Sequence, residues 1–126
     1  MSDAAARIEI TVRPEYAEDH SAPEQGRFVF IYHISIRNAG DAPAQLLRRH
    51  WIITDAEGRV EEVEGEGVIG QQPTIPAGAE HTYQSFCVLE TPVGCMQGSY
   101  QMLGADGDTF TAPIAPFTLA APGSLN

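Results

Sequence analysis

One segment of the chain, residues 28–36, has the sequence FVFIYHISI. Every second residue from Phe28 onward is apolar, and on the opposite face Val29 and Ile31 are apolar as well. A strand that is apolar on both faces is typical of the middle of a covered sheet. The segment therefore predicts a central β-strand, and the rest of the fold can be worked out from its neighbours.

Apolar and polar residues alternate on both sides of this strand, and no stretch has the 3.6-residue period of a helix. Asp55–Gly58 and Asp106-Gly107 are hairpin signals between alternating segments. About seven short strands separated by turn signals predict an all-β fold, an immunoglobulin-like or fibronectin type III-like sandwich of antiparallel strands. The expected strands are 8–13, which Pro14 ends, 28–36, 45–54, 59–64, 80–88, 96–102 and 110–119.

Several residues have expected places within such a sandwich. Trp51 shares a strand face with Leu47 and is expected to be the central aromatic residue of the core. Tyr100 suits a tyrosine corner, in which the phenol hydroxyl bonds the backbone. Val60 and Val63 are out of strict alternation, which indicates a β-bulge.

The last expected strand contains Pro113 and Pro116, which remove two N–H donors from it. We therefore expect this strand to lie at a sheet edge or to carry a bulge. The tail that follows, residues 120–126, is expected to be loose.

The chain has 126 residues and a net charge of −10, with seven Arg, no Lys and 17 acidic residues. This length suits one domain over residues 1–126, with a core from about 6 to 120 and short flexible termini. Binding to nucleic acid needs clustered cations, and docking on anionic lipid needs basic patches, so neither is expected. No apolar run is long enough for a membrane span, and the N-terminus lacks the features of a signal peptide. We therefore expect a cytoplasmic protein.

Two cysteines, Cys87 and Cys95, form no CxxC motif and have no matching Cys/His pair for zinc. Cytosolic thiols stay reduced, so we expect two small, partly buried apolar side chains rather than a disulfide.

Gly65, Gly67 and Gly70 fit the pattern GxGxxG, which in a dinucleotide site lets the backbone approach a pyrophosphate at a helix N-terminus. Here Pro73 and Pro76 follow, and they are incompatible with the helix that such a site requires. The pattern favours an ordinary sandwich loop, and a phosphate site remains the alternative.

Arg48 and Arg49 are adjacent in an expected strand, so they point to opposite faces, with Arg49 toward the Trp51 side. One hypothesis is an anchor for an anion or carboxylate on the sheet surface. The favoured interpretation is an ion pair with the acidic strand across the hairpin.

An acidic run in that strand is a candidate site for Mg²⁺ or Co²⁺, which accept oxygen ligands. The favoured interpretation is a solvated, charged face that protects a sheet edge. No Ser, Cys or His stands in a pattern typical of nucleophilic catalysis, so we expect no enzymatic activity and no cofactor. The acidic residues concerned are Glu61, Glu62, Glu64 and Glu66.

Several long motifs together resemble the ApaG family. The longest is AQLLRRHWIITD, followed by GR and EVEGEGVIG, within residues 44–70. The resemblance extends over about residues 6–120. Its other parts are Val12–Tyr16, Tyr32 with Ile36–Asn38, Pro73–Pro76 and Glu90–Tyr100.

The resemblance implies a fibronectin type III-like sandwich and a stand-alone bacterial protein. Bacterial ApaG proteins are named for a neighbouring diadenosine tetraphosphate hydrolase gene and are commonly labelled as Co²⁺/Mg²⁺ resistance or efflux proteins. Similar eukaryotic domains, in an F-box protein and a DNA-polymerase-interacting protein, look like protein-interaction modules. The resemblance thus favours a non-enzymatic module that binds an unknown protein partner and is associated with Co²⁺/Mg²⁺ resistance. The alternative is a sensor that binds a nucleotide or pyrophosphate, such as a dinucleoside polyphosphate, through the loop from Gly65 to Gly70 and Arg48.

Overall fold

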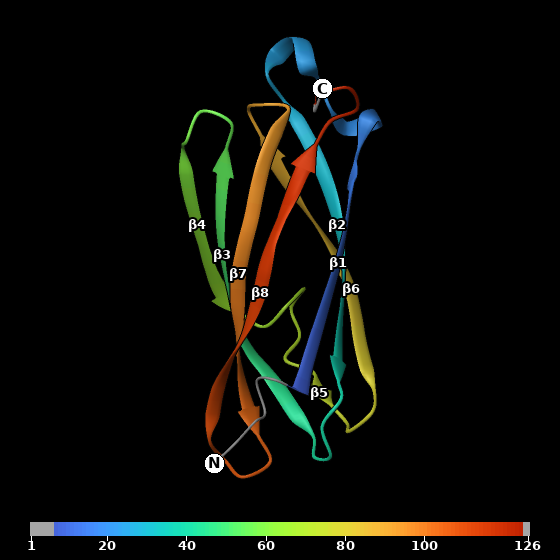
Figure 1. Ribbon diagram of the computed structural model, residues 1–126, viewed down its shortest axis with the longest axis vertical. Coiled ribbons are helices and arrows are strands. Elements are labelled where there is room, and N and C mark those ends of the chain that lie inside the picture. The colour runs from blue at the N-terminus through green and yellow to red at the C-terminus, as the bar shows by residue number, and fades with distance from the viewer. Residues whose placement is uncertain (1–6, 125–126) are drawn as a thin grey trace.

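The computed structural model describes residues 7–124, which form eight β-strands and two short 3-10 helices (Figure 1). No helix in this part of the chain is long and apolar enough to cross a bilayer. The elements are β1 (Ile8–Tyr16), η2 (Glu18–His20), η3 (Pro23–Gln25), β2 (Phe28–Asn38), β3 (Ala44–Asp55), β4 (Val60–Glu66), β5 (Thr74–Ile75), β6 (Glu80–Leu89), β7 (Val93–Gly104) and β8 (Thr109–Ala120).

The strands form two antiparallel sheets that pack face to face. One sheet has the order β1-β2-β6, and the other has the order β4-β3-β7-β8, with the short β5 beside β3. The predicted class, a fibronectin type III-like β-sandwich, is confirmed. The prediction for residues 28–36 is also confirmed, since β2 pairs with β1 on one side and with β6 on the other.

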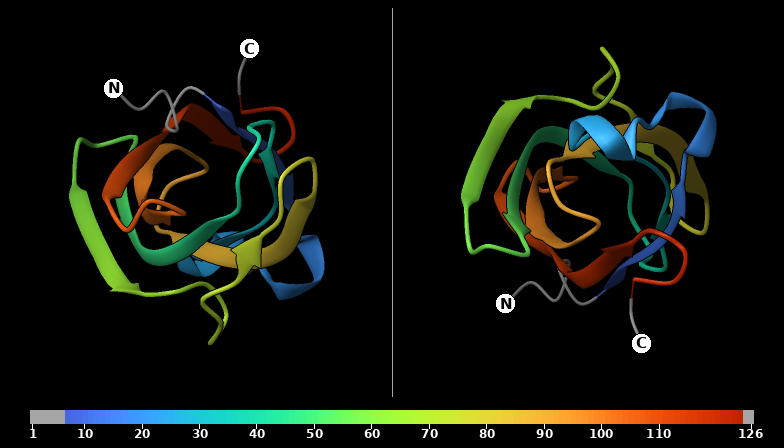
Figure 2. Two further views of the ribbon diagram at one scale, coloured as in Figure 1. Left: turned by 90° about the horizontal axis from the view of Figure 1, so that it is seen from below. Right: turned by 90° about the horizontal axis from the view of Figure 1, so that it is seen from above.

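The two sides of the sandwich differ. On one side β1 and β8 lie next to each other, as the view along the long axis shows (Figure 2). On the other side the edges are β4 and β6, which belong to different sheets. We call this second side the β4–β6 seam.

Trp51 occupies the middle of the core, as expected, with 3% of its surface exposed. Tyr32 and Phe117 pack edge-on against its ring, with ring centroids 5.5 and 5.9 Å away. Tyr100, which is fully buried, lies 6.5 Å away in the same edge-on orientation. Aromatic rings from both sheets thus meet around one indole, in the offset geometry that ring quadrupoles favour.

A β-bulge lies in β3, away from the place where one was predicted. The pairing of β3 with β7 shifts between Leu46 and Arg48, which makes Leu47 the extra residue. Leu46 is therefore fully buried on the Trp51 face, and the expected assignment of Leu47 to that face was wrong. The bulge predicted near Val60 is also wrong, because β3 and β4 pair in continuous register.

Two proline predictions had different outcomes. Pro14 does not end β1, which continues to Tyr16 with Pro14 paired opposite Tyr32. This is tolerated because β1 is an edge strand. The last strand, β8, lies at an edge and carries a register shift close to Pro116, so both expectations for it are confirmed.

At the C-terminal end, Ala121 is buried and donates a hydrogen bond to the carbonyl oxygen of Pro92, so the first part of the expected loose tail is anchored. Residues 125 and 126, like residues 1–6, lie outside the described part. Cys87 and Cys95 are free thiols, as expected.

Candidate functional site

The glycine motif lies where β4 ends and the chain turns toward β5. The amides of Val68 and Gln71 each donate to the other's carbonyl oxygen, at 2.8 and 3.0 Å. The amide of Gly67 donates to the carbonyl oxygen of Leu47 at 2.8 Å. A phosphate-binding loop instead directs its amides toward the ligand. Three amides of this loop are therefore committed to its own folding.

Two of the motif glycines lie in close contacts, one with backbone and one with a side chain. Gly67 has a φ of +64°, and a Cβ there would lie 2.1 Å from the carbonyl oxygen of Gln71. A Cβ on Gly65 would lie 2.8 Å from Nη1 of Arg49. At Gly70, by contrast, a Cβ would meet nothing within 4 Å. The first two glycines thus make room for the returning loop and for the Arg49 guanidinium.

Arg49 is anchored against the glycine loop from the inner face of β3. Its Nη1 donates to the carbonyl oxygens of Glu66 and Gly67, at 3.2 and 3.0 Å. Neither Arg49 nor Arg48 forms an ion pair with a carboxylate in residues 7–124, so the favoured cross-hairpin ion pair was wrong. Arg49 faces inward and is held by backbone carbonyls, whereas Arg48 is exposed.

The acidic run on β4 is exposed and divided between two faces by the strand's alternation. On the outer face, Glu62 bonds Nε2 of His50 through Oε1 at 2.8 Å, so His50 makes the cross-hairpin contact expected of the arginines. Glu64 and Glu66 share the alternation of Glu62, and Glu61 does not. Within the described residues no group of three or more His, Cys, Asp or Glu side chains is placed to hold a metal ion. The cation site at these residues stays a prediction.

A pocket of about 280 Å³ lies in the β4–β6 seam beneath the glycine loop. Arg49 and Glu66 line it from one sheet, and Tyr32, Tyr83 and Ser85 line it from the other. Burial raises the pKa of Tyr83 well above its usual range, and a hydrogen bond with Tyr100 offsets only part of this. Burial likewise raises the pKa of Tyr32. Both phenols stay protonated near neutral pH, so the pocket offers neutral hydroxyl donors beside a guanidinium.

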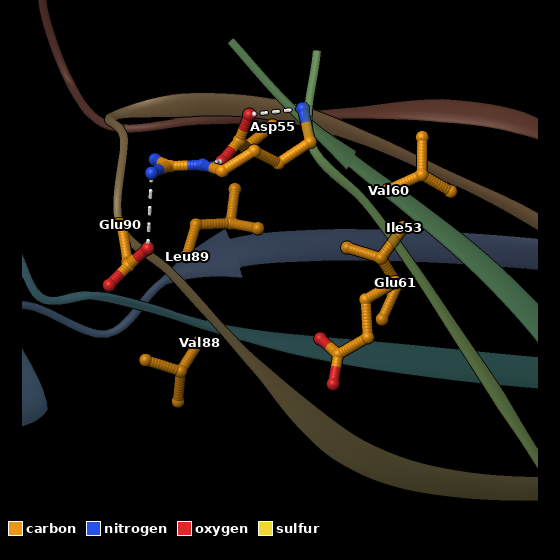
Figure 3. A pocket seen from close by; sticks show the side chains of 8 residues that line it. Ile53, Asp55, Val60, Glu61, Val88, Leu89 and Glu90 are labelled. Carbon is orange, nitrogen blue, oxygen red and sulfur yellow. Dashed lines mark hydrogen bonds and ion pairs between the residues drawn. The ribbon is translucent and has the colours of Figure 1, made fainter. Parts of the chain in front are cut away.

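A second pocket, of about 270 Å³, lies further along the same seam. Figure 3 shows Asp55 and Glu90 toward one end of it and Val60 and Glu61 toward the other. The guanidinium of Arg59 bridges the first pair, with Nε 2.6 Å from Asp55 and Nη1 3.5 Å from Glu90.

The pKa values of Asp55 and Cys87, near the second pocket, are both shifted. Partial desolvation raises the pKa of Asp55, but hydrogen bonds from Arg59 and the backbone outweigh it and leave this pKa below its usual range. The Glu61 carboxylate has no hydrogen bond or ion pair within residues 7–124. Together with burial, which is the larger cause, its charge raises the pKa of the Cys87 thiol to about 11.

A third pocket, of about 390 Å³, lies on the outer face of the β1-β2-β6 sheet. Ile31 and Phe86 line it as neighbours on β2 and β6, and Arg27 borders it. Ser85 lines both this pocket and the one beneath the glycine loop. The free edge of β6 therefore has a pocket on each side.

The exposed large apolar side chains of residues 7–124 line these three pockets. Phe86 has 66% of its surface exposed and Val88 has 38%, and both lie on β6. Val60 on β4 and Ile69 in the glycine loop are each 62% exposed. They line the pockets from opposite sides of the seam. This grouping joins residues far apart in the sequence.

Sequence reasoning selected Arg48 and the three glycines, and it missed Tyr83, Phe86 and the pocket role of Arg49. A signal for Phe86 was present, since residues 81–89 contain no Asp, Glu, Arg or Pro although they form a strand. No local signal marks Tyr83, because its partner Tyr100 lies in the other sheet.

Comparison with known proteins gives consistent matches. A family model described as the ApaG domain matches residues 18–104. Protein ApaG of Pseudomonas syringae pv. tomato is 56% identical over 126 residues, which cover all of both chains. An X-ray structure of a structural genomics target matches with a TM-score of 0.91 and 47% identity, over 97% of this chain and 92% of that one. A crystal structure described as an ApaA protein from Bordetella pertussis has a TM-score of 0.90 and 47% identity, over 92% of this chain and 94% of that one.

Proposed function

The chain belongs to the ApaG domain family, and we propose that it works in the cytoplasm as a non-enzymatic β-sandwich module that binds another protein. The observation that carries this proposal is the grouping of exposed apolar side chains along the β4–β6 seam. Phe86 and Val88 face solvent from one strand, and Val60 and Ile69 face it from the opposite side. Soluble proteins keep grouped apolar side chains exposed mainly where they bind something.

The proposal is tested by cross-linking from the seam in living cells. We would replace Phe86 with p-benzoylphenylalanine, and as a control place the same residue at Thr118, which is exposed on β8. A partner that cross-links only from position 86 is identified by mass spectrometry and purified. Its affinity for the purified chain should then fall about tenfold in the Phe86→Ser variant, since that is the effect expected of a central apolar contact. Equal cross-linking from both positions would contradict the proposal.

We also propose that the association with Co²⁺/Mg²⁺ resistance depends on this partner rather than on a cation bound at the acidic strand. The supporting observation is that the four carboxylates of the acidic strand lie on two different faces of β4. In a strain that lacks the chain, the Phe86→Ser variant should fail to restore growth in Co²⁺. A variant with Glu61, Glu62, Glu64 and Glu66 all changed to Gln should restore it. The opposite result would favour direct cation binding.

A second candidate function is a sensor for a nucleotide or pyrophosphate. It is favoured by the Arg49 guanidinium, which lies in the 280 Å³ pocket with phenol hydroxyls and makes no ion pair within residues 7–124. An amide-resolved NMR titration with a dinucleoside polyphosphate and Mg²⁺ tests it. Saturable shifts at Gly65–Gly70 and Arg48 that disappear in Arg49→Gln would support the sensor. Spectra unchanged at millimolar ligand would exclude it.

A further inference from the structure

The two sheets have four long edge strands, and three of them carry features that hinder pairing with another chain. β1 contains Pro14, β8 contains Pro113 and Pro116, and these two strands also lie against each other. Natural sheets protect their edges with prolines, charges and covering segments. The exposed carboxylates on β4 are Glu61, Glu62, Glu64 and Glu66.

The fourth edge strand, β6, has no such protection beyond its first residue, Glu80. Residues 81–89 contain no Asp, Glu, Lys, Arg or Pro. The strand pairs with β2 in continuous register, from Glu80 opposite Arg37 to Leu89 opposite Phe28. No bulge therefore turns it away from an approaching strand. β2 is its only paired neighbour in the described part of the chain, so a row of backbone N–H and C=O groups points away from the sheet. A long uncharged edge of this kind is a template for one more strand.

Pockets flank the free edge of β6 on both faces. On the outer face lies the 390 Å³ pocket beside Phe86. On the inner face lie the 280 Å³ pocket at Tyr83 and Ser85 and the 270 Å³ pocket at Leu89. Alternate side chains of a strand point to opposite faces. A strand added beside β6 would therefore direct one set of side chains over the outer pocket and the other set into the two inner pockets.

We propose that the β6 edge binds an extended segment of a partner protein, which adds to the β1-β2-β6 sheet as a fourth strand. Apolar side chains of this segment cover Phe86 and Val88 on the outer face, and a Lys or Arg side chain enters the inner pocket beside Glu61. The proposal rests on the proposed function as a protein-binding module and specifies its surface and the chemistry of its partner.

Charge is the reason for a basic side chain in the partner. Glu61 lines the 270 Å³ pocket, and its carboxylate has no ion pair or hydrogen bond in the described part of the chain. Asp55 and Glu90 line the same pocket and share the single cation of Arg59. The pocket thus has three carboxylates and one guanidinium, which a basic side chain complements.

The same charges disfavour a second copy as the occupant. Each copy has a net charge of −10. Pairing two β6 edges would also bring two sets of seam carboxylates together, and like charges side by side oppose association. A basic segment would instead be steered toward this side of the molecule.

The test uses full-length protein and a random dodecapeptide library displayed on phage. The most enriched peptide is synthesised, and its binding is followed by amide-resolved NMR together with hydrogen exchange. We expect an alternating apolar and basic sequence. We also expect alternate amides of residues 81–89 to exchange at least about tenfold more slowly in the complex, because each newly bonded amide opens only when the added strand leaves.

Single substitutions then test the two faces separately. Phe86→Lys places a charge on an exposed outer position and should weaken binding of the peptide about tenfold or more. Glu61→Gln should weaken it about three- to tenfold, as expected for loss of one charge pair. Glu64→Gln removes the same charge from the opposite face of β4 and should change the affinity less than about twofold. The amide spectrum of each free variant establishes that it is folded.

Three results would overturn this inference. A peptide that binds saturably but leaves the β6 amides unprotected docks elsewhere, and the proposed function would then survive without the added strand. Protection of β6 amides that rises with protein concentration in the absence of peptide would identify a second copy as the occupant. If no peptide binds, the inference fails, while the cross-linking experiment from Phe86 decides the proposed function by itself.

Discussion

The hydroxyl of Tyr83 on β6 and the hydroxyl of Tyr100 on β7 form a hydrogen bond that joins the two sheets. The expected tyrosine corner at Tyr100 was therefore wrong, because the partner of this buried phenol is a side chain of the opposite sheet. Tyr100 is fully buried, whereas Tyr83 lines the pocket beneath the glycine loop and is half-buried. Removing the Tyr83 hydroxyl and removing the Tyr100 hydroxyl should therefore lower the stability by different amounts.

Tyr83→Phe should lower the free energy of unfolding by about 1–3 kcal/mol, because it leaves the buried Tyr100 hydroxyl without a partner. Tyr100→Phe should cost less, since the Tyr83 hydroxyl can turn toward water in the pocket. The double variant should be more stable than the sum of the single effects predicts, because no polar group is then left unpaired. Urea denaturation of the four proteins measures these values. Equal and additive effects would mean that the hydroxyls do not depend on each other.

Alkaline pH should destabilise the protein through the same tyrosines. Burial raises the pKa values of Tyr32, Tyr83 and Tyr100 above the ordinary value of 10.0. The unfolded chain therefore releases these protons at a lower pH than the folded chain, so the free energy of unfolding falls as pH rises above about 10. Absorbance at 295 nm should show these three phenols ionising only as the protein unfolds. Early ionisation of all the tyrosines in folded protein would contradict this expectation.

Acid should remove a different contribution, that of Asp55. Its pKa in the folded chain lies below the ordinary value of 3.8, so its ionised form stabilises the fold. This stabilisation is fully present above about pH 5 and is lost as pH falls through the lower folded value. Asp55→Asn should therefore lower stability near neutral pH and flatten its decline below pH 4. Urea denaturation from pH 3 to 7 measures both effects. Asp41→Asn, at an exposed carboxylate in the turn after β2, is the control and should leave the profile unchanged.

Two glycines of the loop form a matched pair for substitution. Gly70→Ala should cost about 1–2 kcal/mol, because it places a side chain on a residue with left-handed backbone angles. Gly67→Ala adds a collision with the Gln71 carbonyl oxygen and should cost about 3–4 kcal/mol. Thermal and urea unfolding of both variants provide the comparison. Equal costs would show that the loop can open at Gly67. Gly67→Ala is for this reason unsuitable as a probe of ligand binding, and Arg49→Gln is the better choice.

Local patterns were sufficient for most of the fold. The alternation from Phe28 to Ile36 predicted the central strand, and Asp106-Gly107 predicted a hairpin that the structure contains. Trp51 was placed in the core from its strand face alone. These predictions succeed because alternation with period two and turn chemistry depend only on residues close together in the sequence.

Local patterns were insufficient where pairing between distant strands decides which side chains are buried and what they contact. Leu46 rather than Leu47 is buried because the register with β7 shifts between Leu46 and Arg48, and no local pattern marks that shift. Arg49 bonds backbone carbonyls of the glycine loop because the loop folds back over the inner face of β3.

The candidate site depends most of all on tertiary structure. Local alternation and composition account for the strands, their apolar faces and an uncharged segment at residues 81–89. Only the tertiary structure placed that segment at a free edge, opposite β4 and between pockets on both faces. The physical reason is that alternation specifies which side of a strand is apolar, whereas long-range pairing and sheet packing specify which strands become edges and what lies beside them.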